Sequence, residues 1–127
     1  MVKKILIPGN HDRELLQHAS FTSLFEHISP MMYIRIGNQP IYLSHFPFLC
    51  FDGAYKGLEA TWQLFGHVHS KKTQETGLDV ERLTHLFPTQ YDVGVDNNNY
   101  YPVSFNQVKE IIKEQQYSLN LYRGGSE

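Results

Sequence analysis

Polar residues suited to metal or acid–base chemistry gather in three short motifs. In chain order these are Gly9-Asn10-His11-Asp12, Ser44-His45-Phe46-Pro47 and Gly66-His67-Val68-His69. Each motif follows a stretch predicted to be a strand, and ligands of layered α/β domains bind beyond the carboxyl ends of strands. If these strand ends lie side by side, four imidazoles, one amide and one carboxylate converge. Neutral imidazole nitrogen is a common ligand of divalent transition metals, and an amide oxygen can join it.

The third motif places two histidines, His67 and His69, one residue apart after a glycine. In an extended segment both side chains point the same way, because side-chain direction repeats every two residues. One imidazole can then serve one ion and the other a second ion, as in hydrolytic sites whose ions lie about 3.5–4 Å apart. Glycine permits the sharp turn and close backbone approach that such a site requires.

Each motif has a plainer interpretation when taken alone. His11 fits a turn histidine, His45 a core histidine, and the pair His67 and His69 a surface pair. Asn10 after glycine fits a turn residue in the left-handed conformation, which is compatible with ligation. The three motifs together favour a shared site over these separate roles.

Strands are needed to position these motifs, and the pattern of apolar residues predicts five of them. They are predicted at residues 2–8, 32–36, 40–45, 62–66 and 91–96. Gly37-Asn38 suits the tight turn of a hairpin between the second and third. Residues 13–28 carry apolar side chains near helical spacing, which predicts a helix.

The C-terminal part begins with a helix signal. Ser104 and Gln107 form a capping-box pattern, and an amphipathic helix is predicted to end near Gln116. Residues 117–123 alternate and predict an edge strand. The order of elements predicts one α/β or α+β layered domain over residues 1–123, with 124–127 as a disordered tail.

Composition excludes several classes of protein. The chain has 127 residues, 41% hydrophobic and 19% charged, which is typical of one globular domain. A net charge of −2 argues against electrostatic capture of nucleic acid, and no apolar run approaches the ~20 residues that span a bilayer. A cytoplasmic protein without membrane contact is therefore expected. The single cysteine, Cys50, among apolar neighbours predicts a buried, inert thiol.

In this order, GNHD, SHFP and GHVH resemble the second half of the calcineurin-like metallophosphoesterase family. The segment DVGVDNNNYYPVSFNQV resembles the C-terminal segment of small bacterial members, so that the likeness covers residues 5 to about 112. The resemblance implies a truncated calcineurin-like phosphoesterase fold, with mixed β-sheets flanked by helices.

The resemblance also implies a ligand set. Asn10, His45 and His67 would bind one divalent ion, and His69 would bind the other. Mn, Zn, Fe and Ni all fit nitrogen and oxygen ligands of this kind.

By the same resemblance, His11 would stabilise the phosphoryl oxygens and protonate the leaving alkoxide, and Asp12 would hydrogen-bond His11. The nucleophile would be a metal-bound hydroxide, since a cation can lower the pKa of bound water from 15.7 to about 7. The implied activity is hydrolysis of a small phosphate mono- or diester.

Two motifs of the family do not occur in this sequence. The family pattern opens with Asp-x-His and then Gly-Asp-x-x-Asp, and this chain has no Asp-x-His and no Gly-Asp pair. We therefore expect one ion rather than two. The alternatives to an active enzyme are a catalytically impaired relative that binds a metal or a protein partner, and a fragment that needs its missing N-terminal half. An apolar strand at 2–8 without neighbours would favour a second copy or a partner covering its edge.

Overall fold

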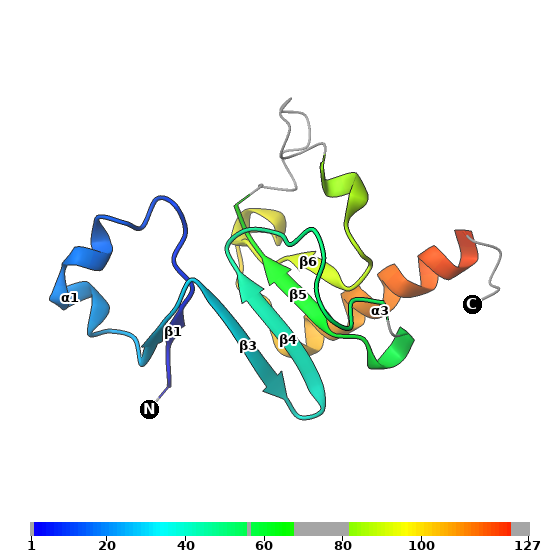
Figure 1. Cartoon of the computed structure of the whole chain (residues 1–127), viewed down its shortest axis with the longest axis horizontal. Coiled ribbons are helices and arrows are strands. Elements are labelled where there is room, and N and C mark those ends of the chain that lie inside the picture. The colour runs from blue at the N-terminus through cyan, green and yellow to red at the C-terminus, as the bar shows by residue number, and fades with distance from the viewer. Residues whose placement is uncertain (1, 56, 68–81, 123–127) are drawn as a thin grey trace.

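The computed structural model describes residues 2–55, 57–67 and 82–122 (Figure 1). Within these ranges the chain forms a four-stranded sheet, a two-stranded sheet, two α-helices and four short 3-10 helices. Parallel and antiparallel pairs both occur, which confirms the coarse prediction of a mixed α and β protein. Among the described helices, none is both long and apolar enough to cross a membrane.

The larger sheet carries the ends of two predicted motif strands. It consists of β3 (Met31–Ile36), β4 (Gln39–Ser44), β5 (Trp62–Phe65) and β6 (Gln90–Asp92), in this spatial order. β3 runs antiparallel to β4, whereas β4, β5 and β6 are mutually parallel. The carboxyl ends of β4, β5 and β6 therefore lie at one edge of the sheet (Figure 1).

The predicted hairpin between β3 and β4 is confirmed. Its register pairs Ile34 with Ile41 and Ile36 with Gln39, which leaves Gly37 and Asn38 as the turn. Gly37 has a φ of 58°, a conformation that glycine adopts without steric cost.

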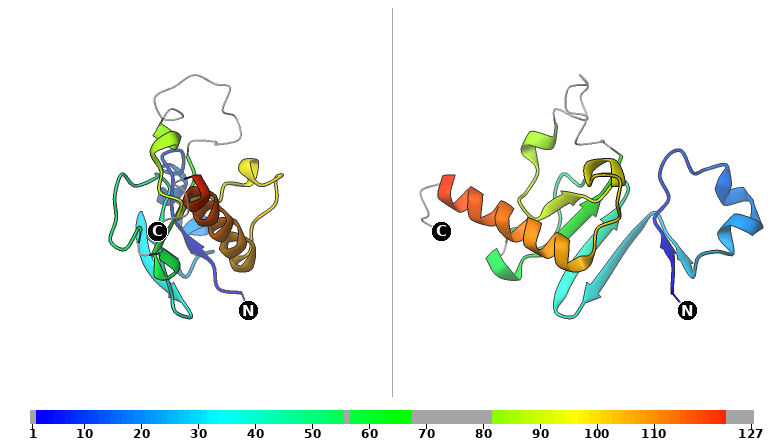
Figure 2. Two further views of the ribbon diagram at one scale, coloured as in Figure 1. Left: turned by 90° about the vertical axis from the view of Figure 1, so that its right-hand side faces the viewer. Right: turned by 180° about the vertical axis from the view of Figure 1, so that it is seen from behind.

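One face of the sheet packs on α3 (Phe105–Tyr122), which lies across β5 and β6 (Figure 2). The buried core of this layer consists of Ile41, Trp62, Val108 and Ile112. The Trp62 ring also contacts the Phe105 ring, with centroids 5.3 Å apart. The core therefore joins the central strands to the first three turns of the helix.

The capping box at the start of α3 forms both of its hydrogen bonds. The Ser104 N–H donates to Gln107 Oε1 at 2.8 Å, and the Gln107 N–H donates to Ser104 Oγ at 3.1 Å. The predicted end near Gln116 and the strand at 117–123 are wrong, because the helix continues to Tyr122. Extending an existing helix by one residue costs little free energy, because each added residue forms one more backbone hydrogen bond. A strand would need a neighbouring strand to form its hydrogen bonds.

The other face of the sheet is covered by residues 46–55. Phe48 and Phe51 contact the Tyr42 ring at 5.9 and 6.0 Å between centroids. Because these two phenylalanines turn inward, the intervening residues turn outward, and Cys50 is exposed. The prediction of a buried thiol is wrong for this reason.

The N-terminal residues form a small unit beside β3 (Figure 1). β1 (Ile5–Leu6) pairs in parallel with β2 (His27–Ile28), and η1 (Leu15–Gln17) and α1 (Ala19–Thr22) connect them. The predicted buried strand at 2–8 shrinks to two residues, and Ile5 is 45% exposed.

The predicted helix at 13–28 is broken at His18, whose φ of −107° and ψ of 117° are extended. Leu15 and Leu24 are 44% and 59% exposed, so these apolar side chains of the predicted helix are not buried against the rest of the protein. Most helical stability in proteins comes from such packing, which explains why helical spacing alone fails here. The remaining 3-10 helices are η2 (Gly57–Glu59), η4 (Arg82–His85) and η5 (Val95–Asn97); η5 replaces the end of the strand predicted at 91–96.

Candidate functional site

Three predicted ligand residues meet at one point of the structure. His45 Nε2 lies 3.1 Å from Asn10 Oδ1 and 3.3 Å from His67 Nδ1. All three residues are half-buried. Asn10 comes from the turn after β1, His45 follows β4, and His67 follows β5, so the predicted meeting of these three strand-end motifs is observed.

Parallel pairing of β4 and β5 explains how the two histidines meet. The Gly66 N–H donates to the His45 carbonyl at 2.9 Å, which fixes the two strand ends side by side. His67 then has a φ of 63°, in the left-handed region. This conformation costs a non-glycine residue roughly 1–2 kcal/mol, and such residues concentrate at functional sites.

The turn at residues 9–12 presents Asn10. The Asp12 N–H donates to the Gly9 carbonyl at 3.1 Å, and the Gly9 N–H donates to Asp12 Oδ2 at 2.8 Å. The Asp12 carboxylate therefore closes the turn. The expected hydrogen bond between the His11 imidazole and the Asp12 carboxylate is not among the contacts of the described residues, and His11 is exposed to solvent beside Asn10.

Gly9 is required for the close approach of His45. A Cβ at position 9 would lie 2.7–2.9 Å from three atoms of the His45 ring, closer than real Cβ contacts. The glycines of these motifs were predicted to permit close backbone approach. At Gly9, the group that approaches the backbone is the His45 ring.

Replacing Gly9 with alanine is expected to displace the His45 ring. Overpacking of this kind costs about 1–3 kcal/mol of the free energy of unfolding. Because the ring carries the central nitrogen of the cluster, affinity for a divalent cation should fall at least about tenfold. Thermal unfolding and calorimetric titration with Zn²⁺ and Mn²⁺ measure the two effects.

Gly66→Ala is the matched control, since a Cβ there would meet the same ring at an ordinary 3.6 Å. It should leave both stability and cation affinity nearly unchanged. Equal behaviour of the two variants would contradict the packing argument.

The two separations that centre on His45 Nε2 fit a shared cation. Ligand atoms about 2.0–2.1 Å from a tetrahedral ion lie about 3.3 Å from one another. The observed separations are 3.1 and 3.3 Å. One proton on His45 Nε2 can form a linear hydrogen bond with only one neighbour, whereas a cation among the three atoms would contact all of them.

The amide oxygen of Asn10 is essential to this fit. Among the described residues, no group of three or more histidine, cysteine, aspartate or glutamate side chains is arranged to hold a metal ion. Asn10 Oδ1 would add a third ligand atom to the two imidazole nitrogens within the described residues. His69, the predicted ligand of a second ion, lies outside the described residues.

An aromatic residue of the cluster was missed by sequence reasoning. The Phe46 ring lies 5.0 Å from the His45 ring and 4.6 Å from the His67 ring, between centroids. The only signal in the sequence was its position between His45 and Pro47.

Two buried glutamines that hydrogen-bond to the backbone after His45 were also not predicted from the sequence. Gln63 is 0% exposed, and its Oε1 accepts hydrogen bonds from the Phe48 N–H at 3.1 Å and from Gln90 Nε2 at 2.9 Å. Gln90 Nε2 also donates to the Phe48 carbonyl at 2.9 Å. A glutamine inside the apolar run Trp62–Phe65 was a readable signal, because buried polar groups need partners.

The loop after β6 is held by its own polar side chains. The amides of Asn97 and Asn98 donate to the Asp92 carbonyl at 3.0 and 3.1 Å, and the Gly94 N–H donates to Asp92 Oδ1 at 2.9 Å. The Tyr91 hydroxyl donates to Asn98 Oδ1. Partial burial, followed by the charge of Asp92, raises the pKa of Tyr91 above its ordinary value. These contacts give the segment a turn-forming role.

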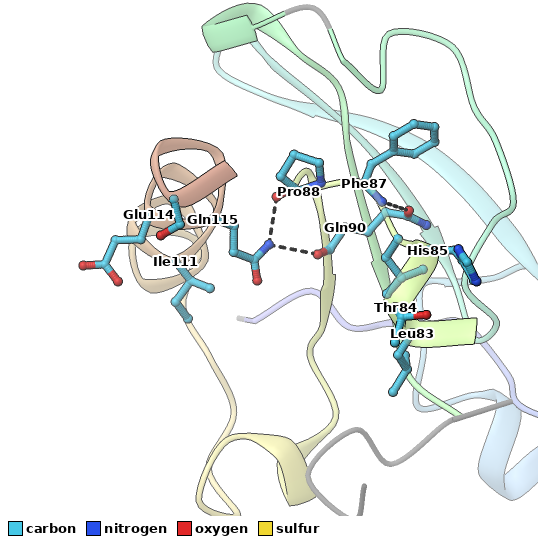
Figure 3. A pocket seen from close by; sticks show the side chains of 11 residues that line it. Leu83, Thr84, His85, Phe87, Pro88, Gln90, Ile111, Glu114 and Gln115 are labelled. Carbon is cyan, nitrogen blue, oxygen red and sulfur yellow. Dashed lines mark hydrogen bonds between the residues drawn. The ribbon is translucent and has the colours of Figure 1, made fainter. Parts of the chain in front are cut away.

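A separate pocket of about 870 Å³ lies between η4 and α3 (Figure 3). Gln115 Nε2 crosses from the helix and donates to the carbonyls of Pro88 and Gln90, at 2.8 and 3.1 Å. None of Asn10, His45 and His67 lines this pocket. Its hydrogen bonds tie α3 to the strand, and it is not part of the histidine cluster.

Comparison with protein-family models, with curated proteins and with solved structures found no match. Function is therefore inferred from the geometry of the cluster and from the motif resemblance.

Proposed function

We propose that this chain is a metal-dependent phosphoesterase of calcineurin-like type, which hydrolyses a small phosphate mono- or diester. The observation that carries the proposal is the approach of Asn10 Oδ1 and His67 Nδ1 to His45 Nε2, at separations of 3.1 and 3.3 Å that fit ligands of a divalent ion. These atoms come from three motifs that are far apart in the sequence and that the family resemblance joins.

In this proposal each residue of the site has a separate role. Asn10, His45 and His67 would hold the ion, which when bound lowers the pKa of a coordinated water and offsets negative charge on the phosphoryl group. His11 is exposed next to Asn10 and would donate a proton to the leaving oxygen of the phosphoester. Asp12 fixes the turn that carries both residues through its bond to Gly9.

A second candidate is a phosphoesterase-like protein that binds one ion without turnover. The observation in its favour is that the chain has no Asp-x-His and no Gly-Asp pair, the motifs that would supply a bridging carboxylate. Two-metal sites stabilise the attacking and leaving oxygens together, so one ion gives less catalysis. A related candidate is that the chain becomes active only together with a second polypeptide that carries the two absent motifs.

Steady-state hydrolysis of p-nitrophenyl phosphate and bis-p-nitrophenyl phosphate tests the proposal. The purified full chain is assayed with Mn²⁺, Zn²⁺, Ni²⁺ or Co²⁺, and with chelator. We expect metal-dependent release of p-nitrophenol. His11→Ala should lower kcat by about 10²–10⁴-fold, the usual contribution of a general acid, with cation affinity unchanged.

His85→Ala serves as the control, since His85 lies in η4 and contributes no atom to the cluster. It should leave kcat unchanged. Cation binding without turnover under every ion would reject the enzyme and support the second candidate.

A further inference from the structure

We propose that Phe46 is a specificity-determining residue, whose ring forms an apolar wall for the organic group of the substrate. The inference rests on the proposed function, because it names the kind of phosphoester that the cluster would prefer. Esters that carry a flat aromatic group should bind more tightly than those that carry a small aliphatic group.

The three rings of the cluster form a compact triangle. Centroid distances are 5.0 Å between His45 and Phe46, 4.6 Å between Phe46 and His67, and 5.1 Å between His45 and His67. Phe46 has no donor or acceptor in its side chain, so it cannot be a ligand of the ion. What it adds to the cluster is an apolar ring directly beside the two imidazoles.

The ring is open to solvent despite these contacts, since Phe46 is 47% exposed. An exposed apolar ring next to convergent polar atoms is typical of a ligand site, in which a few polar groups fix orientation and apolar surface adds affinity. A phosphoryl group on the polar side would place its organic substituent within reach of the ring. Aromatic rings pair favourably in stacked or edge-to-face geometry, beyond the burial of their area.

The backbone that carries the ring is fixed in advance. Gln63 Nε2 donates to the Phe46 carbonyl at 3.5 Å, and two further bonds from Gln63 and Gln90 hold the Phe48 N–H and carbonyl. Both glutamines are buried. Because this backbone is already ordered, binding does not require it to be ordered at a cost in entropy. The site can then distinguish ligands by their shape.

Binding of two unreactive phosphonates tests the proposal without requiring turnover. Phenylphosphonate and methylphosphonate share the charged head and differ in the apolar group. Calorimetric titration of the Mn²⁺-loaded full chain should give about tenfold tighter binding of phenylphosphonate. In Phe46→Ala this preference should disappear, while the affinity for methylphosphonate stays the same.

Leu49→Ala is the matched control, because Leu49 is an apolar residue of the same segment and is 82% exposed. It should keep the preference. Equal binding of both ligands by the wild-type chain, or a preference that survives in Phe46→Ala, would overturn the proposal alone. A parallel loss of methylphosphonate affinity would also overturn it, because the ring would then serve to hold the imidazoles. Binding of neither ligand by the wild-type chain would overturn it together with the proposed function.

Discussion

Replacing His45 with alanine is expected to lower the affinity for a divalent cation by at least about a hundredfold. Loss of a residue that merely orients a ligand costs 10–100-fold in metal affinity, and in the proposed site His45 would supply the ligand atom itself. Its Nε2 lies 3.1 Å from Asn10 Oδ1 and 3.3 Å from His67 Nδ1. Without it, Asn10 and His67 remain as two ligands without a third.

Calorimetric titration with Zn²⁺, and the rise in melting temperature that saturating Zn²⁺ produces, measure this effect. A ligand at a hundred times its Kd stabilises the folded state by about 2.7 kcal/mol, and this increment should vanish in His45→Ala. His18→Ala is the control, since His18 lies between η1 and α1 and supplies none of the converging atoms. Unchanged Zn²⁺ affinity in His45→Ala would remove the basis of the candidate site.

Replacing Trp62 with alanine is expected to lower the free energy of unfolding by about 3–5 kcal/mol, the usual cost of truncating a buried aromatic residue to alanine. Trp62 is 5% exposed in the centre of the core and contacts Phe105 of α3. Since single domains are stabilised by only about 5–15 kcal/mol in total, this loss brings the chain close to unfolding.

Urea denaturation followed by circular dichroism measures the change. Tyr101→Ala provides the control, because this tyrosine is of comparable size and 72% exposed, and its loss should change stability by less than about 0.5 kcal/mol. A loss of under about 1 kcal/mol in Trp62→Ala would mean that α3 does not pack on the sheet in solution.

Local signals predicted the elements that depend on local chemistry. Gly37-Asn38 fixed the hairpin and Ser104 with Gln107 fixed the start of α3, because turn and cap preferences act through neighbouring residues. The meeting of His45 and His67 follows from strand pairing, whereas Asn10 follows β1 of the other sheet and reaches His45 from outside the sheet that carries the histidines. Parallel pairing then brings His45 and His67 to the same edge.

Signals that depend on packing failed. Apolar residues at helical spacing between 13 and 28 predicted one helix, yet their stripe packs on little and His18 is extended. Cys50 was predicted to be buried from its neighbours, but Phe48 and Phe51 occupy the inner side of that segment. The role of Phe46 depended on ring contacts with residues that the sequence does not place.

The contact between Asn10 and His45 joins the N-terminal unit to the end of β4 in the larger sheet. These residues are 35 positions apart. An ion held between them would stabilise their contact by its binding free energy, because the site exists only when both residues are in place. The N-terminal unit, with its small sheet and exposed apolar residues, would then depend on the ion for its attachment. Metal occupancy and the order of residues 5–28 would rise and fall together.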